Sequence, residues 1–341
     1  FPCYATRKHH FPRKGRTYSL CKILLQSKRN LKGKELTINM KKRLRDLEGY
    51  GGKFPDITWP GGRKLAVQFV LNLEEGGENS VIYGDEHSET FLSEIIGAEP
   101  FYGKRHMSIE SLYEYGSRAG VWRILQLFRD REIPLTVFAV SQALQENQKV
   151  VEQILKDNHE ICSHGLRWIN YRDIPRDLEK EHMEKAIEIQ KNLCGSRPLG
   201  WYTGRTSENT RDLVCEEGGF VYDSDDYSDD LPFWSKVTPK PHLIIPYTLD
   251  TNDMRFLTNQ GFNNGNQFFN YLKDTFDCLY QERFSGPKMM SIGLHCRIIG
   301  KPGRFGSLKK FLDYTREFSD VWFASRISIA NYWRKVLPYE E

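Results

Sequence analysis

An almost continuous apolar run, residues 65–73, most constrains what this chain can fold into. A run of this length without alternation of apolar and polar positions is typical of a strand buried on both faces. It ends at two adjacent carboxylates, Glu74 and Glu75, and then at two glycines, which let the backbone turn and leave room for a ligand. Because α/β folds place their chemistry at the carboxyl ends of such strands, we predict a functional site here.

Short apolar strands alternate with helical segments along the rest of the chain. We expect strands at 136–140, 160–163, 201–203, from 221, 243–246, 288–294 and 321–324. We expect helices at 121–131, 142–157, 177–192, 209–217, 267–281, from 308, and up to 336. Residues 76–119 form a long turn-rich insertion, of a kind that is often functional or packs on a neighbouring subunit. This alternation predicts a parallel α/β fold, and the number of strands fits a distorted (β/α) barrel better than an open sheet.

The first 39 residues differ from the remainder in charge. They hold ten of the 49 Lys and Arg residues and one of the 45 Asp and Glu residues, which leaves 39 basic and 44 acidic residues. This negative balance does not favour a nucleic-acid partner, whose binding site would need basic residues on a folded face. We predict a basic N-terminal extension at 1–39, disordered or not native, which is either a transit peptide or a leader before Met40, and a single catalytic domain at 40–341.

Several protein classes lack sequence support. No run of 18 or more apolar residues is present, so we expect no membrane partner. The seven cysteines are scattered without a Cys-x-x-Cys pair, which favours neither a zinc module nor a disulfide framework and suggests a cytoplasmic protein. There is no G-x-G-x-x-G or phosphate loop, and we expect no cofactor.

Further polar and aromatic residues fall at predicted strand ends. They include His164, the stretch 201–205 and His295, and in a barrel these ends share one mouth. Two His and two Glu residues at such ends favour a site that adds water to a carbonyl or amide. A carboxylate would take a proton from water, and an imidazole would donate one to the leaving nitrogen. Two adjacent carboxylates also raise the pKa of one of them.

The order of these motifs resembles the polysaccharide deacetylase (NodB-homology) superfamily. Glu74 and Glu75 stand at the place of its Asp-Asp pair, residues 164–168 at its His-x-x-x-His motif, and His295 at its late Leu-x-His motif. Two positions depart from the family pattern, because Trp168 replaces the second metal-ligand His and Glu75 replaces the metal-binding Asp. An indole cannot bind a metal, so at most two protein ligands would remain.

These departures are similar to the metal-independent allantoinase branch of that superfamily, and the resemblance covers residues from about Met40 to the end. It implies hydrolysis of the hydantoin ring of allantoin to allantoate in purine degradation, without a metal. It further implies an oligomer, a homotetramer. It also implies the roles of individual residues. Glu74 or Glu75 would activate water, His295 would protonate the leaving nitrogen, and His164 would orient water or polarise the carbonyl.

The resemblance further suggests which residues bind the ureido and ring groups of the substrate. These are Trp168, Trp201, Tyr202, Arg205 and Asn252. Core packing of the three aromatic residues and a structural ion pair of Arg205 remain open at this point. Two other functions also remain open: a metal-dependent deacetylase of chitin or peptidoglycan that uses His164 and Glu75, and a catalytically inactive scaffold that binds carbohydrate or ureide.

Overall fold

The sheet is built around β1 (Leu65–Leu73), whose nine residues are all buried. β1 pairs in parallel with β2 (Leu135–Ala139) on one side and with β8 (Lys288–His295) on the other. Both faces of β1 are covered, which explains why its sequence is almost wholly apolar rather than alternating. The buried strand predicted at 65–73 is confirmed with the same bounds.

The computed structural model describes residues 45–238 and 240–339. The described residues from Asp46 onwards form one compact unit. The extension predicted at 1–39 lies outside the described residues, so its interpretation stays a prediction.

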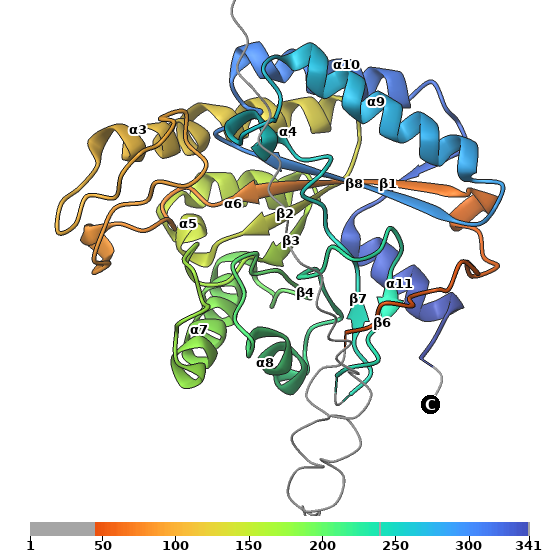
Figure 1. Cartoon of the computed structure of the whole chain (residues 1–341), viewed down its shortest axis with the longest axis horizontal. Coiled ribbons are helices and arrows are strands. Elements are labelled where there is room, and N and C mark those ends of the chain that lie inside the picture. Colours follow the sequence, from red (N-terminus) through yellow and green to blue (C-terminus); the bar gives the residue numbers. More distant parts are fainter. Residues whose placement is uncertain (1–44, 239, 340–341) are drawn as a thin grey trace, which may run out of the picture. The chain divides into compact units, whose positions relative to one another are not determined.

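The strands follow the order β6-β7-β5-β4-β3-β2-β1-β8, and β9 (Val321–Phe323) also pairs with β1. The shorter strands are β3 (Glu160–Ser163), β4 (Gly200–Trp201), β5 (Tyr222–Asp223), β6 (Phe233–Trp234) and β7 (Leu243–Ile244). Every pair except β6 with β7 is parallel. A parallel bridge between Asn252 and Gly293 links the segment after β7 to β8, so the sheet curls towards closure. The predicted α/β fold with a distorted barrel is confirmed (Figure 1).

Helices follow the strands and cover the outside of the sheet. They are α3 (Met107–Tyr115), α4 (Val121–Asp130), α5 (Ser141–Glu146), α6 (Gln148–Lys156), α7 (Arg176–Cys194), α8 (Thr210–Glu217), α9 (Gly265–Glu282), α10 (Pro302–Thr315) and α11 (Arg326–Val336). Figure 1 shows α9 and α10 side by side above the long strands β1 and β8, with α7 and α8 near the short strands. Short 3-10 turns lie at Pro60–Gly62, Val81–Tyr83 and Asp253–Leu257, and Gly116–Gly120 forms a π-helical turn.

Several predicted segments differ in their bounds, for example the helix expected from 308, which begins at Pro302, and two differ in kind. The insertion at 76–119, predicted to be rich in turns, contains α3, which begins at a cap where the His106 side chain accepts from the N–H of Ile109. The helix expected at 142–157 is two helices, because Asn147 leaves the helical conformation with φ −138° and ψ 74°. Its side chain donates to Ser117 Oγ at 2.8 Å, which ties this break to the π-helical turn.

Successive residues of β1 serve two different cores. The odd-numbered positions pack against the helices. The ring centroid of Phe69, for example, lies 5.1 Å from that of Phe128 of α4 and 6.3 Å from that of Phe311 of α10. The even-numbered positions face the inside of the curl, where Gln68 accepts from Nη1 of the fully buried Arg326 at 2.7 Å. Because side chains alternate across a strand, this register also decides which face the residues just beyond β1 serve.

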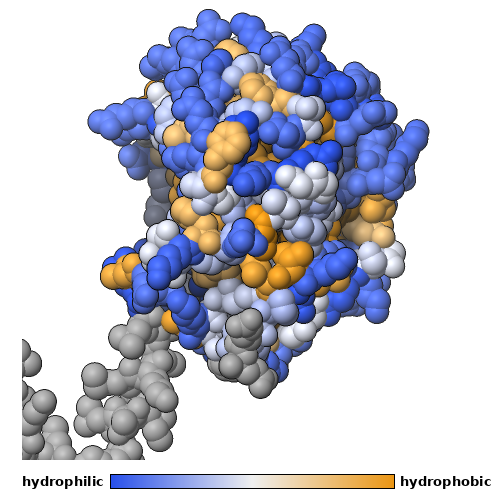
Figure 2. Space-filling view, turned by 90° about the vertical axis from the view of Figure 1, so that its right-hand side faces the viewer, coloured by the Kyte–Doolittle hydropathy of each residue, from blue (hydrophilic) through white to orange (hydrophobic). Residues whose placement is uncertain are grey.

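Among the described residues, no helix combines the length and the apolar character needed to cross a membrane. The face drawn in Figure 2 is mostly hydrophilic, with hydrophobic residues gathered near its centre.

Candidate active site

Three side chains at the carboxyl ends of β1, β3 and β8 meet around one carboxylate oxygen. Oε1 of Glu74 lies 3.4 Å from Nε2 of His164 and 3.7 Å from Nε2 of His295. All three side chains are buried. The parallel sheet places these strand ends at one edge, so it brings together three of the four residues for which we predicted catalytic roles.

The alternation along β1 separates the two adjacent glutamates. Asn72 and Glu74 face the inside of the curl and line a cavity of about 780 Å³, whereas Leu73 packs into the helix-side core. Glu75 continues the alternation on the same side as Leu73, and it is not among the residues that line the cavity. The two carboxylates therefore do not form a paired acid and base facing one substrate.

Glu75 lies instead against the π-helical turn. Its Oε1 accepts from the backbone N–H of Arg297 and its Oε2 from that of Glu74, both at 3.2 Å. A Cβ built on Gly116 would lie 2.1 Å from Oε1 of Glu75, so this close approach requires glycine. Burial raises the pKa of Glu75, and this effect exceeds the opposing effect of the Arg297 charge.

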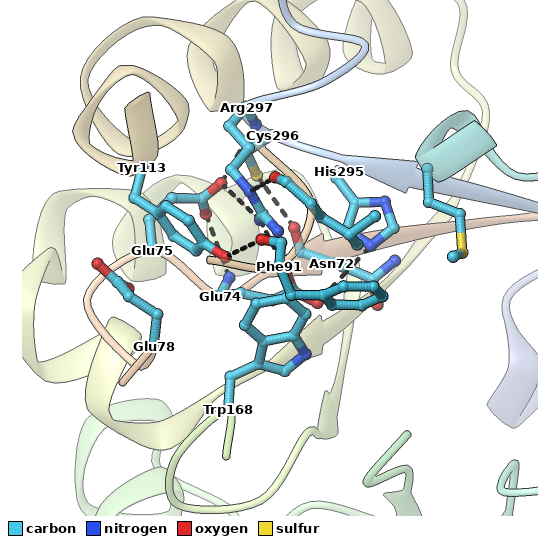
Figure 3. A network of polar contacts seen from close by, with 12 residues as sticks. Asn72, Glu74, Glu75, Glu78, Phe91, Tyr113, Trp168, His295, Cys296 and Arg297 are labelled. Carbon is cyan, nitrogen blue, oxygen red and sulfur yellow. Dashed lines mark hydrogen bonds and ion pairs between the residues drawn. The ribbon is translucent and has the colours of Figure 1, made fainter. Parts of the chain in front are cut away.

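Arg297 connects both glutamates to an aromatic wall (Figure 3). Its Nη1 lies 2.7 Å from Oε2 of Glu74 and 3.6 Å from Oε1 of Glu75. The guanidinium lies over the ring of Tyr113, 4.1 Å from its centroid, and 5.1 Å from that of Trp168. It is almost fully buried, so the charge acts on the carboxylates with little solvent screening.

The surroundings of Glu74 favour its ionised form. Burial alone would raise its pKa, but the positive charge of Arg297 and the two imidazoles outweigh burial. The pKa of Glu74 is therefore held well below its usual range. A buried carboxylate in this state accepts hydrogen bonds from groups in the cavity.

His295 forms a buried dyad with Asp253. Oδ1 of Asp253 lies 2.6 Å from Nδ1 of the imidazole. Oδ2 accepts from the backbone N–H groups of His295 at 2.8 Å and Ile299 at 3.0 Å, which fixes the carboxylate. Burial lowers the pKa of His295, but the charges of Asp253 and Glu74 outweigh it and the net shift is upward. The dyad thus favours a protonated imidazole whose Nε2 faces Glu74.

Seven of the nine predicted site residues line the same cavity: Glu74, His164, His295, Trp168, Tyr202, Arg205 and Asn252. Trp201 is the second predicted residue, besides Glu75, that does not line it. The Trp201 indole donates to Thr203 Oγ1 at 2.8 Å and packs against Phe220, with ring centroids 5.2 Å apart. The substrate-binding role predicted for Trp201 therefore has no support from its position, because neighbouring residues of a strand point in opposite directions.

Tyr202 and Asn252 lie in the cavity wall with their polar groups already bonded. The Tyr202 hydroxyl is 2.9 Å from that of Tyr227, and its ring meets His164 edge to face at 4.9 Å between centroids. The Asn252 side chain accepts from the N–H of Met254 at 2.9 Å and donates to the carbonyl of Thr248 at 3.0 Å. Both residues shape the wall, and Tyr202 also limits the movement of His164.

Trp168 carries the Arg205 guanidinium on its ring. Cζ of Arg205 lies 3.7 Å from the indole centroid, and Phe91 stacks on the same indole at 5.9 Å between centroids. Arg205 also pairs with Glu89, with 3.1 Å between Nη1 and Oε2. Trp168 is thus a stacking surface at the position where the superfamily motif has a metal ligand.

The donor set does not fit the divalent metal that the superfamily pattern implies. In the described part of the chain, no group of three or more His, Cys, Asp or Glu side chains is arranged to hold a metal ion. The Glu75 carboxylate accepts backbone N–H groups away from the cavity, and the indole of Trp168 offers no lone pair. The guanidinium of Arg297 already provides a fixed positive charge beside Glu74.

Sequence reasoning assigned no role to three residues that organise this site: Glu89, Asp253 and Arg297. Arg297 lies two residues after His295, and Asp253 follows Asn252, so both stand close to predicted site residues in the sequence. Their partners are distant in sequence, and only the fold shows which charges meet. Glu89 lies in the insertion, where no periodicity indicated its orientation.

Comparisons with known proteins agree with this geometry. A family model for polysaccharide deacetylase matches residues 103–217. A candidate polysaccharide deacetylase of Schizosaccharomyces pombe is 46% identical over 316 residues, covering 87% of this chain and 98% of that protein.

Two solved structures are similar over most of the chain. One is described as a probable polysaccharide deacetylase from Pseudomonas aeruginosa, with 58% identity, a TM-score of 0.86, and coverage of 87% of this chain and 100% of that one. The other is described as PuuE allantoinase, with 57% identity, a TM-score of 0.86, and coverage of 87% and 99%.

Proposed function

The chain belongs to the polysaccharide deacetylase family, as its motifs predict, and within this family we propose that it hydrolyses the hydantoin ring of allantoin to allantoate. The observation that carries the proposal is that side chains unable to bind a metal stand around Glu74 in place of the metal ligands of the superfamily. Trp168 stands at the second metal-ligand position, Glu75 faces away from the cavity, and Arg297 supplies the positive charge. The similarity to PuuE allantoinase supports the choice of substrate.

In this proposal Glu74 is the general base. Its Oε2 is held by Arg297 and its Oε1 faces the two imidazoles, so a water molecule beside Oε1 would be within reach of His164 as well. Glu74 takes a proton from that water, and the water oxygen adds to the ring carbonyl carbon. The other predicted candidate, Glu75, lies outside the cavity lining, so the role passes to Glu74 alone.

His295 is the general acid in this proposal. Asp253 holds its Nδ1, so the other nitrogen carries the proton that faces Glu74 and the cavity. When the tetrahedral intermediate collapses, the ring C–N bond breaks and Nε2 donates its proton to the leaving nitrogen. His164 orients the attacking water. Its Nδ1 has no hydrogen-bond partner among the described residues, so the ring is held by the contact of its Nε2 with Glu74 and by packing against Tyr202.

The alternative function is metal-dependent N-deacetylation of polysaccharide, which the names of the relatives favour. It would use His164 and Glu75 and needs a third metal ligand, which Trp168 does not provide. Glu75 also lies outside the cavity lining. A scaffold without catalytic activity is the other alternative. One experiment distinguishes these two alternatives from allantoin hydrolysis.

The experiment is allantoin hydrolysis by protein purified in excess chelator, with the metal content measured on the same sample. We expect turnover with far less than one metal ion per chain. Glu74→Gln should lower kcat by about a hundredfold or more, because it removes the base while conserving shape. Glu110→Gln, which alters an exposed ion pair with Arg105, serves as the matched control.

Three results would contradict the proposal. Allantoin turnover that depends on stoichiometric metal would reject the metal-free mechanism. Release of acetate from acetylated oligosaccharides on addition of zinc, without allantoin turnover, would favour the deacetylase. Absence of both activities under all metal conditions would favour the inactive scaffold.

A further inference from the structure

Arg205 is held as a fixed cation in the cavity wall. Its Nη1 lies 3.1 Å from Oε2 of Glu89 and donates to the carbonyl of Trp168 at 3.3 Å. Its Cζ lies 3.7 Å above the Trp168 ring and 5.1 Å from that of Phe91. A guanidinium fixed by an ion pair, a carbonyl and two rings has lost most of its rotational freedom before any ligand arrives.

Glu89 serves Arg205 rather than a ligand. Its Oε1 accepts from the backbone N–H groups of Thr90 at 2.9 Å and Phe91 at 3.0 Å. Its Oε2 accepts from Asn79 at 2.9 Å as well as from Arg205. A carboxylate offers about four acceptor positions, so these four bonds use its capacity. Burial raises the pKa of Glu89, but Arg205 and the N–H donors outweigh it, and the group is ionised.

Arg205 retains donors that the fold does not use. Among the described residues, the hydrogen bonds of its guanidinium all go through Nη1, which leaves the N–H groups on Nε and Nη2 for a ligand. Arg205 lines the cavity that also contains Glu74. The Trp168 indole contacts both this guanidinium and Arg297 of the reaction centre, whose Cζ atoms lie 3.7 Å and 5.1 Å from its centroid. Arg205 thus lines the same cavity as the reacting groups but lies outside that cluster.

We propose that Glu89 is a positioning residue that fixes Arg205 as the receptor for the ureido arm of the substrate, and that this pair selects ureido-substituted rings over plain hydantoin. This inference rests on the proposed function. The ureido carbonyl would accept from the free N–H groups of Arg205. Hydrolysis of the ring does not require that arm, so the contact determines substrate preference rather than the chemical step.

The test compares allantoin with hydantoin, which has the same ring without the arm. For Glu89→Gln and Arg205→Lys, the KM of allantoin should rise about tenfold to a hundredfold, the usual effect of losing a hydrogen bond to a charged group. The inhibition constant of hydantoin, used as a competitive inhibitor, should change less than about twofold. The kcat for allantoin should change much less than its KM, because the reacting groups are untouched.

The control is Glu217→Gln. Glu217 pairs with Arg197 at 2.8 Å, and that guanidinium also lies over an aromatic ring, Phe220, at 5.2 Å, yet neither charged residue lines the cavity. This variant should keep both constants at the values of the unmodified protein. Thermal unfolding of all variants separates misfolding from altered recognition.

Two outcomes would overturn the inference, and they differ from failure of the proposed function. If the Glu89 and Arg205 variants weaken allantoin and hydantoin equally, or weaken neither, the pair does not recognise the arm. If the unmodified protein hydrolyses no allantoin, the proposed function fails, and the inference fails with it.

Discussion

Nη1 of Arg297 lies 2.7 Å from Oε2 of Glu74, while the other oxygen of this carboxylate faces His164 and His295. One oxygen of this carboxylate is therefore fixed by an ion pair, and the other is the proposed proton acceptor. The anchor comes from a residue two positions after His295, so the end of β8 and the turn that follows it supply the proposed acid and the group that holds the proposed base. Such coupling fixes the distance between the two catalytic groups, which the reaction requires.

Arg297→Met should weaken the proposed base. Arg297 lowers the pKa of Glu74, so its removal raises that pKa. A base must be deprotonated, and the acidic limb of the profile of kcat/KM against pH should therefore move to higher pH. We also expect kcat/KM at neutral pH to fall about a hundredfold or more.

Arg297→Lys provides the matched variant, because it keeps the charge but loses the geometry of the guanidinium. It should shift the acidic limb less than Arg297→Met does. If the acidic limb lies at the same pH in the unmodified protein and in both Arg297 variants, Arg297 does not act on the ionisation of the base. Since removal of one partner of a buried ion pair costs about 3–5 kcal/mol of stability, unfolding is measured beside the kinetics.

Asp253→Asn tests the proposed acid. Asp253 and Glu74 together raise the pKa of His295, and the acid must be protonated to act. Loss of the Asp253 charge lowers that pKa, so the basic limb of the rate profile should move to lower pH. The kcat for allantoin should fall about a hundredfold to ten-thousandfold, since general acid catalysis contributes that much.

NMR titration of His295 in the same variant measures the shift directly. If the imidazole titrates at the same pH with Asn as with Asp at position 253, the dyad does not set its protonation. A lower titration pH with an unchanged rate profile would mean that His295 is not the acid.

Trp168→His tests whether residue 168 alone prevents metal binding or whether other residues of the site prevent it as well. The variant regains the His-x-x-x-His spacing, yet Glu75 accepts backbone N–H groups outside the cavity and Arg297 places a positive charge beside Glu74. We expect far less than one zinc per chain after incubation and gel filtration. Stoichiometric zinc would show that position 168 alone prevents metal binding.

The strands that carry the site could be predicted from the sequence because long apolar runs identify buried parallel strands. β1 and β3 have the predicted bounds, and β8 differs by one residue, His295. Strand ends then indicate a shared edge, which explains why the predicted residues His164 and Glu74 line the same cavity. The position of Glu75 outside the cavity lining had a signal in the sequence. Alternation continued beyond β1 places residues 74 and 75 on opposite faces, and alternation at the end of β4 does the same for Trp201 and Tyr202.

The remaining site residues could not be found in this way. Asp253 and Arg297 act through partners on other elements, and Glu89 lies in an insertion whose path depends on its packing. A charge in a loop has no periodicity, so its orientation depends on tertiary contacts alone. The insertion also conceals α3, because its side-chain cap, His106, is not among the residues that usually mark a helix start.

Gly116→Ala should disturb the site from the side that faces away from the cavity, where Gly116 contacts Glu75. A Cβ at this position would lie 2.1 Å from Oε1 of Glu75 and 2.8 Å from the backbone nitrogen of Arg297. Glu75 is buried and bonded to backbone N–H groups, so it has little room to move. Crowding of this kind costs about 1–3 kcal/mol, measured as a change in the free energy of unfolding by denaturant.

The same substitution should also lower kcat, because the displaced Arg297 no longer anchors Glu74. Gly306→Ala is the control. Gly306 lies within α10 with open space around its Cβ position, so alanine there should stabilise the protein by about 0.5–1 kcal/mol and leave kcat unchanged. If Gly116→Ala is as well tolerated as Gly306→Ala, the π-helical turn is not a rigid support for Glu75. If it lowers stability but not kcat, the position of Arg297 is not transmitted to the base, and the anchor role of Arg297 is wrong.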